Sequence, residues 1–103
     1  MKPPGLRDKD IDVLCNTFRQ FSTVREVRVF GSRANGVASR RSDLDLAISS
    51  NEGVASEWTA LQEALEKAPL IYELDIVRLD SIMSERLKER IAREGITIYQ
   101  RED

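Results

Sequence analysis

Apolar residues along the chain recur first at helical and then at strand spacing. The first of them recur at intervals of three and four, at Ile11, Leu14, Phe18 and Phe21. This spacing predicts a helix that is capped by Asp10 or a nearby aspartate and ends at about Ser22. Residues 24–30 alternate between two faces and are rich in β-branched and aromatic types, which predicts a strand that ends at Gly31. Asn35-Gly36 then predicts a tight turn, or a single short helix followed by a bend, within residues 32–37, and the polar residues 39–42 continue that loop.

The rest of the chain predicts three more strands and two more helices. Residues 43–48 alternate strictly, which predicts a strand that ends in the polar residues 49–53. Apolar residues at helical spacing between Val54 and Ala68 predict a helix that stops at Pro69. Residues 70–79 predict a third strand, residues 82–94 an amphipathic helix that ends at Gly95, and residues 96–99 a short last strand.

The order of these elements predicts the fold class. Helices alternate with strands, and we find no internal repeat and no linker, so we expect an α/β (α+β) fold with helices packed on a sheet. At 103 residues, the chain is expected to form one domain over residues 1–103. The order of the strands stays open.

Composition excludes several function classes. The chain has no histidine, so His-based general-base catalysis and His-containing zinc sites are excluded. The net charge of −2 gives no overall positive field, and direct nucleic-acid binding is not expected. Cys15 lies in an apolar stretch and is predicted to be buried, without a chemical role. We find no signal-peptide pattern and no apolar run of membrane-spanning length, so we expect a cytoplasmic protein without membrane contact.

The stretch from Gly31 to Asp45 carries the candidate chemistry. Gly31-Ser32 follows a predicted strand, where backbone N–H groups and a hydroxyl suit a phosphate. Asp43 and Asp45 share one strand face, roughly 6.6 Å apart along the strand. Two carboxylates so placed repel each other unless a cation lies between them. Mg²⁺ is typically held by one or two carboxylates together with substrate phosphates.

A two-metal site commonly needs a third carboxylate from another strand. Asp75 is our candidate, because it lies in an otherwise apolar predicted strand, where an unpaired charge facing the core would cost several kcal/mol. Glu73 has the same parity along that strand and is the rival third ligand.

These residues carry a resemblance to a known family. Gly31-Ser32, ten intervening residues and then Asp43-x-Asp45 resemble the signature of the minimal nucleotidyltransferases, within the DNA polymerase β-like nucleotidyltransferase superfamily. Asp75 falls where that family keeps its third carboxylate, and the resemblance extends over about residues 8 to 99.

The resemblance implies a mixed sheet flanked by helices, and nucleotidyl transfer with release of pyrophosphate. It implies ATP or another nucleoside triphosphate bound by Gly31 and Ser32, and Mg²⁺ held by Asp43, Asp45 and Asp75. By proximity to the motif, we add Arg33 as a candidate contact for the triphosphate, and Arg40 and Arg41 as weaker ones.

The short chain leaves little length for a second lobe, which favours an acceptor that docks as a macromolecule. Short members of the family resemble antitoxins that attach AMP to a HEPN ribonuclease toxin, which implies a HEPN partner and a hetero-oligomer. The alternatives are an antitoxin that acts by binding alone, and transfer to a small molecule or an RNA end. Singly, each motif residue also fits an ordinary role as a turn cap, an edge-strand charge or a strand stop.

Overall fold

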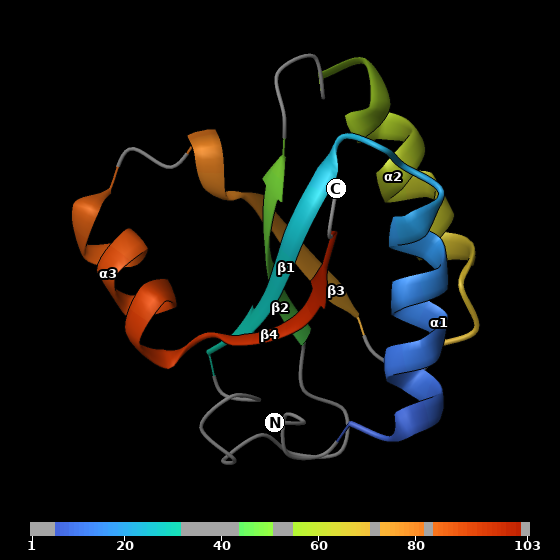
Figure 1. The fold of residues 1–103 in the computed structure, drawn as a ribbon, viewed down its shortest axis with the longest axis horizontal. Helices are drawn as coiled ribbons and strands as arrows, with labels where there is room; N and C mark the ends of the chain where they lie inside the picture. The colour runs from blue at the N-terminus through green and yellow to red at the C-terminus, as the bar shows by residue number, and fades with distance from the viewer. Residues whose placement is uncertain (1–5, 32–43, 51–54, 71–72, 82–83, 102–103) are drawn as a thin grey trace.

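The computed structural model describes residues 6–31, 44–50, 55–70, 73–81 and 84–101. Its four strands form one mixed sheet in the order β3-β2-β1-β4 (Figure 1). β1 (Val24–Phe30) pairs antiparallel with β2 (Leu44–Ser50) and with β4 (Ile96–Gln100), and β3 (Leu74–Arg78) runs parallel to β2. The predicted α/β (α+β) class is therefore confirmed, and the strand order that the sequence left open is now fixed.

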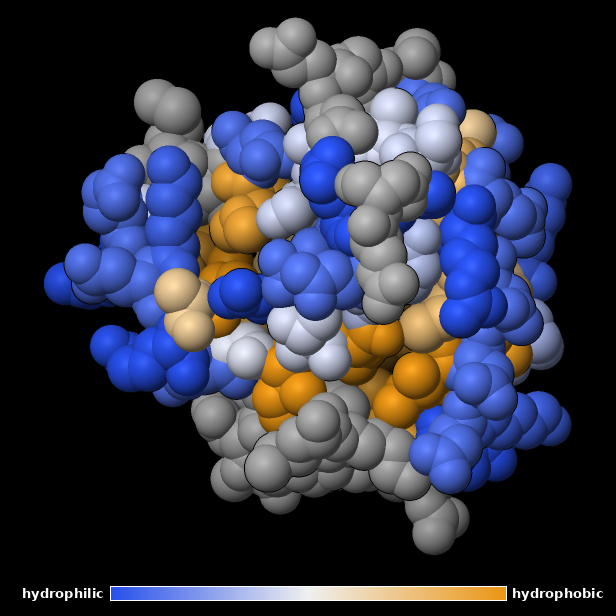
Figure 2. All heavy atoms as spheres, in the orientation of Figure 1, coloured by the Kyte–Doolittle hydropathy of each residue, from blue (hydrophilic) through white to orange (hydrophobic). Residues whose placement is uncertain are grey.

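Three α-helices flank this sheet. α1 (Asp8–Arg19) and α2 (Ala55–Lys67) lie on one side of it, and α3 (Glu85–Glu94) lies on the other (Figure 1). A short 3-10 helix, η1 (Leu79–Ser81), follows β3 directly. The outer surfaces of α1 and α3 are hydrophilic, and hydrophobic atoms show in the seams between each helix and the sheet (Figure 2). None of the helices in the described ranges is long and apolar enough to cross a membrane.

The alternation of side chains in the strands divides the core in two. Residues of one parity in β2, Leu44, Leu46 and Ile48, are fully buried in the main cluster with residues of α1 and α2. Ala47 has the opposite parity and packs with Phe30 and with Ile91 of α3 in a smaller cluster. Both sheet faces are thus covered, but the face toward α3 carries much less apolar material.

Several predicted bounds were wrong. α1 begins at Asp8 and ends at Arg19, not at Ser22. Asp10 is not the capping residue: it lies inside the helix, almost completely buried, and accepts hydrogen bonds from the backbone and guanidinium of Arg7 at 3.0–3.2 Å. Burial and this bidentate pairing explain an aspartate in the core.

The strand ends also differ from the prediction. β2 continues through Ser49 and Ser50, because both pair with β1. β3 contains residues 74–78, not 70–79, and η1 begins at Leu79, the last predicted position. α3 begins at Glu85, where the Ser84 hydroxyl accepts from the Leu87 N–H at 3.2 Å. The predicted turn at Asn35-Gly36 lies outside the described residues.

Cys15 is buried, as predicted, on the side of α1 that contacts β4. Its Sγ donates to the carbonyl oxygen of Ile98 at 3.2 Å. Burial raises the pKa of the thiol; the nearby Arg19 lowers it less than burial raises it, and Asp12 adds to the rise. The thiol therefore stays protonated, which agrees with a packing role.

Candidate active site

Two of the predicted carboxylates meet where β2 and β3 begin and β1 ends. In the antiparallel ladder Asp45 is the partner of Phe30, the last residue of β1. In the parallel ladder the same Asp45 is the partner of Asp75. Because hydrogen-bonded strands lie about 4.8 Å apart, the two aspartates stand side by side across the sheet. Residues 30 positions apart in the chain are thus brought to one place.

The neighbours of these aspartates decide which face they occupy. Leu44 and Leu46 are fully buried against the helices α1 and α2, so Asp45 between them lies on the opposite face. Asp75 lies between Leu74 and Ile76, which pack against the same main cluster. Both carboxylates therefore belong to the face toward α3. Asp45 is half-buried there and Asp75 is exposed.

Gly31 adjoins Asp45 directly after β1. It is buried, with φ +76°, in the left-handed region that favours glycine. A Cβ at this position would overlap Oδ2 of Asp45 and would lie 3.4 Å from its Cγ. A side chain at position 31 would therefore displace the carboxylate, and glycine lets the backbone approach it closely. This contact gives Gly31 a role in the site that depends on its lack of a side chain.

The charges of this arrangement fit a divalent cation. Two carboxylates in adjacent register positions repel each other when both are ionised, and a bound cation removes that repulsion. Oxygen ligands from carboxylates are the donors that Mg²⁺ prefers. In the ranges that the structure describes, no cluster of three or more His, Cys, Asp or Glu residues could hold a metal. Asp43, the remaining carboxylate that the resemblance implies, lies outside those ranges.

The structure thus brings together three of the predicted site residues, Gly31, Asp45 and Asp75. Ser32, Arg33 and Asp43, and also Arg40 and Arg41, lie outside the described residues and stay predictions. The rival ligand Glu73 lies just before β3 and is exposed; its carbonyl oxygen accepts from the Leu44 N–H at 2.8 Å. Of the two rivals, Asp75 is the one that has Asp45 as its partner in the ladder.

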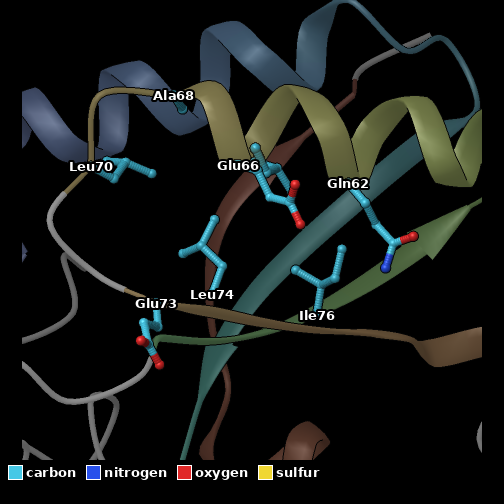
Figure 3. Close-up of a pocket in the computed structure, with 8 residues that line it drawn as sticks. Gln62, Glu66, Ala68, Leu70, Glu73, Leu74 and Ile76 are labelled. Carbon is cyan, nitrogen blue, oxygen red and sulfur yellow. The ribbon is translucent and has the colours of Figure 1, made fainter.

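Two cavities lie beside the sheet. One of about 410 Å³ lies between α2 and β3 and is lined by Leu74 and Ile76, so it opens on the face away from the aspartates (Figure 3). The other, of about 400 Å³, lies between α3 and the sheet, on the same face as Asp45 and Asp75. Its lining includes two basic residues, Arg28 and Lys88.

The sequence analysis did not identify these two basic residues as lining a cavity. Arg28 forms an ion pair with Glu26 at 2.9 Å, and Lys88 forms one with Glu85 at 3.6 Å. The alternation of side chains in the strand could have placed Arg28 on this face, because Arg28 has the same parity as Phe30. Lys88 lies on an amphipathic helix, and the charges of such a helix ordinarily form a solvated face.

Among solved structures, the fold resembles several nucleotidyltransferase proteins. A crystal structure of a toxin–antitoxin pair with AMP-PNP matches with a TM-score of 0.64 and 21% identity, over 89% of this chain and 74% of that one. A protein described as a putative minimal nucleotidyltransferase matches with a TM-score of 0.59 and 33% identity, over 85% of this chain and 88% of that one.

A third match is a complex from Shewanella oneidensis, a tri-AMPylated HEPN toxin with its MNT antitoxin. It has a TM-score of 0.51 and 20% identity, over 91% of this chain and 69% of that one. No curated protein matches. The sequence pattern of the family described as "Polymerase beta, Nucleotidyltransferase" matches residues 7–103. Since that match spans nearly all of the sequence, the chain belongs to the polymerase β-type nucleotidyltransferase family.

Proposed function

We propose that this chain uses Mg²⁺ and ATP to transfer AMP to a hydroxyl group of a partner protein, and that it acts as the antitoxin of a HEPN ribonuclease toxin. The observation that carries the catalytic part is the placement of Asp45 beside Asp75 in the parallel ladder. The partner is supported by two solved complexes of similar fold, the toxin–antitoxin pair with AMP-PNP and the MNT antitoxin with a tri-AMPylated HEPN toxin.

Each site residue has a role in this proposal. Gly31, Ser32 and Arg33 hold the phosphates of ATP, while Asp43, Asp45 and Asp75 are the ligands of Mg²⁺, with two ions in the complete site. When bound, the ions neutralise charge on the phosphates and position the entering and leaving oxygens.

The transfer itself forms one bond and breaks one. The acceptor hydroxyl oxygen attacks the α-phosphorus, the bond from that phosphorus to the bridging oxygen breaks, and pyrophosphate leaves. Asp75 takes the hydroxyl proton, because it is exposed on the face where an acceptor can approach.

The test uses the purified chain with Mg²⁺, α-labelled ATP and a lysate of its source, resolved on a denaturing gel. We expect one labelled protein, absent with Asp43→Asn/Asp45→Asn and with Asp75→Asn. Asp12→Asn is the matched control, because Asp12 is an exposed carboxylate on α1, on the other side of the sheet. Glu73→Gln separates the rival ligands: it should retain labelling that Asp75→Asn loses.

Several outcomes would contradict the proposal. Undiminished labelling by Asp43→Asn/Asp45→Asn would exclude these aspartates from catalysis. A double variant that still neutralises the toxin at unchanged affinity would indicate an antitoxin that acts by binding. Label recovered in the RNA or small-molecule fraction would indicate a different acceptor.

A further inference from the structure

The outer edge of β3 has backbone hydrogen-bonding groups that no strand of the sheet uses. β3 is the last strand of the sheet and pairs only with β2 within the described part of the chain. The Glu73 carbonyl accepts from the Leu44 N–H, so by alternation Asp75 and Val77 also direct their backbone groups toward β2. The N–H and C=O groups of the even-numbered residues Leu74, Ile76 and Arg78 therefore point outward.

A groove with an apolar floor and polar side chains in its lining accompanies this edge. The cavity of about 410 Å³ between α2 and β3 has a floor of leucine and isoleucine side chains, including Leu74 and Ile76, which are only partly buried. Figure 3 shows these two residues projecting from β3 toward α2, with the Glu66 carboxylate directed from α2 toward the strand. An added strand would cover the apolar side chains and meet a carboxylate at the rim.

The opposite edge of the sheet, formed by β4, is protected in two ways against pairing with a further strand. The pairing of β4 with β1 is irregular between Val27 and Arg28, and a bulge of this kind discourages further pairing. In addition, the carbonyl of Ile98 in β4 already accepts from Cys15 of α1. Over its described residues β3 has neither protection, because its register with β2 runs without interruption from Leu74 to Arg78.

We propose that β3 pairs antiparallel with the β3 of a second copy of this chain, about a two-fold axis that passes through Ile76. In this register Ile76 faces Ile76 of the second copy, and Leu74 faces Arg78. All three residues direct their backbone groups outward, so they form hydrogen-bonded pairs along the whole strand. Centring the axis on Asp75 would instead place two carboxylates directly opposite each other, which is destabilising.

The charges along the groove favour a second copy over an unrelated strand. Each copy has an acidic side chain, Glu66, beside Leu74, and a basic side chain, Arg78, at the end of β3. The two-fold register brings Arg78 of the second copy next to Leu74 and hence to Glu66. The Arg78 guanidinium lies 5.6 Å from the centre of the Trp58 ring, and its buried Nε has no hydrogen-bond partner among the described residues. The dimer therefore contains two symmetry-related pairs, each with Glu66 of one copy beside Arg78 of the other.

The dimer would contain a continuous sheet of eight strands, twice the four of each chain. The axis is perpendicular to the sheet, so both α2 helices lie on one face, and Asp45 and Asp75 of both copies lie on the other. The proposal does not rest on nucleotidyl transfer: an Asp45→Asn chain without activity should still dimerise. Failure of one proposal therefore leaves the other unaffected.

The test is the molar mass in solution, measured by sedimentation and light scattering over a series of concentrations. We expect a concentration-dependent dimer. Glu66→Arg should raise its dissociation constant at least about tenfold, because an isologous interface contains the changed pair twice. Arg78→Glu should act in the same direction, and the double variant Glu66→Arg/Arg78→Glu should restore the dimer. Glu63→Arg is the matched control, since Glu63 is on the same helix but does not line the groove.

A backbone variant tests the strand pairing separately. Ile76→Pro removes an N–H that points away from β2, so it should abolish the dimer while circular dichroism still shows a folded chain. Three results would overturn the proposal: a monomer at every concentration, a dimer that both Glu66→Arg and Ile76→Pro leave intact, and a double charge variant no tighter than its single variants. A monomer that binds a synthetic extended basic peptide would assign the edge to another protein instead.

Discussion

Replacing Gly31 by alanine tests the close contact on which the candidate site depends. An alanine at φ +76° carries a left-handed penalty of about 1–2 kcal/mol. Its Cβ would also overlap Oδ2 of Asp45, so the carboxylate must leave its rotamer, at a further cost of about 0.5–1.5 kcal/mol. We therefore expect Gly31→Ala to lower the free energy of unfolding by about 1.5–3.5 kcal/mol, the sum of the two.

The two contributions can be separated by a double-mutant cycle. Asp45→Ala removes the atom that alanine at position 31 would overlap, so in that background Gly31→Ala should cost only the backbone penalty of about 1–2 kcal/mol. Urea unfolding at neutral pH measures all four proteins. The difference between the two backgrounds, about 0.5–1.5 kcal/mol, is the cost of displacing the carboxylate.

Activity gives an independent measure of the same displacement. If Asp45 holds Mg²⁺ as proposed, moving its carboxylate should reduce AMP transfer by Gly31→Ala on the order of a hundredfold, more than the loss of folded protein explains. The reasoning is refuted if Gly31→Ala costs the same stability in the natural chain and in the Asp45→Ala background. It is also refuted if the variant is folded and fully active.

Three further predictions concern stability. Although burial favours a higher value, hydrogen bonds from Arg28 and Thr97 and the charge of Arg28 lower the pKa of Glu26. The ionised Glu26 carboxylate therefore stabilises the fold above the unfolded pKa of about 4.3, and this stabilisation is lost as pH falls through the lower folded pKa. In urea titrations, the difference in free energy of unfolding between the unchanged chain and Glu26→Gln should therefore shrink from about pH 7 to about pH 3. Asp10→Ala should cost about 1–3 kcal/mol in thermal unfolding, because it removes a buried carboxylate that accepts from the N–H ahead of α1; no loss would contradict that role. Ile91→Ala should cost about 2–5 kcal/mol in urea unfolding, since this side chain anchors α3 to the sheet, and a loss below about 1 kcal/mol would show that α3 is not held by packing there.

Local patterns were sufficient to predict most elements. Residues 24–30 form the predicted strand without a change of bounds, because Val27 and Val29 pack in the main cluster while Arg28 and Phe30 lie on the opposite face. Leu70 and Glu73 belong to the same predicted strand as Leu74, yet neither lies in β3; residues 71–72 lie outside the described ones. Whether a residue joins a strand depends on a partner at hydrogen-bonding distance, and the described register of β3 with β2 begins at Leu74. That partner is remote in the sequence, so the pattern alone could not reveal it.

The candidate site was predictable in its residues but not in its arrangement. The spacing of Gly31 from the aspartates identified the residues through the family resemblance, whereas the neighbourhood of Asp45 and Asp75 depends on β2 and β3 being adjacent and parallel. The left-handed backbone of Gly31 and its contact with Asp45 needed coordinates as well. The same is true of the outer edge of β3, since an edge is defined by strands that do not pair with it.

The apolar residues beside the aspartates are what make the site precise. Leu44 and Leu46 in β2, and Leu74 and Ile76 in β3, all pack on the α2 face, so both strands are fixed by their even-numbered side chains. A slip of β3 by one residue would turn Leu74 and Ile76 to the opposite face and drive Asp75 into the main core, where an ionised carboxylate is unfavourable by several kcal/mol. The hydrophobic core therefore excludes this slip and keeps Asp75 on the same sheet face as Asp45. In this fold the residues that stabilise the sheet also set the geometry of the carboxylates, and variants of the core should change activity before they change the fold.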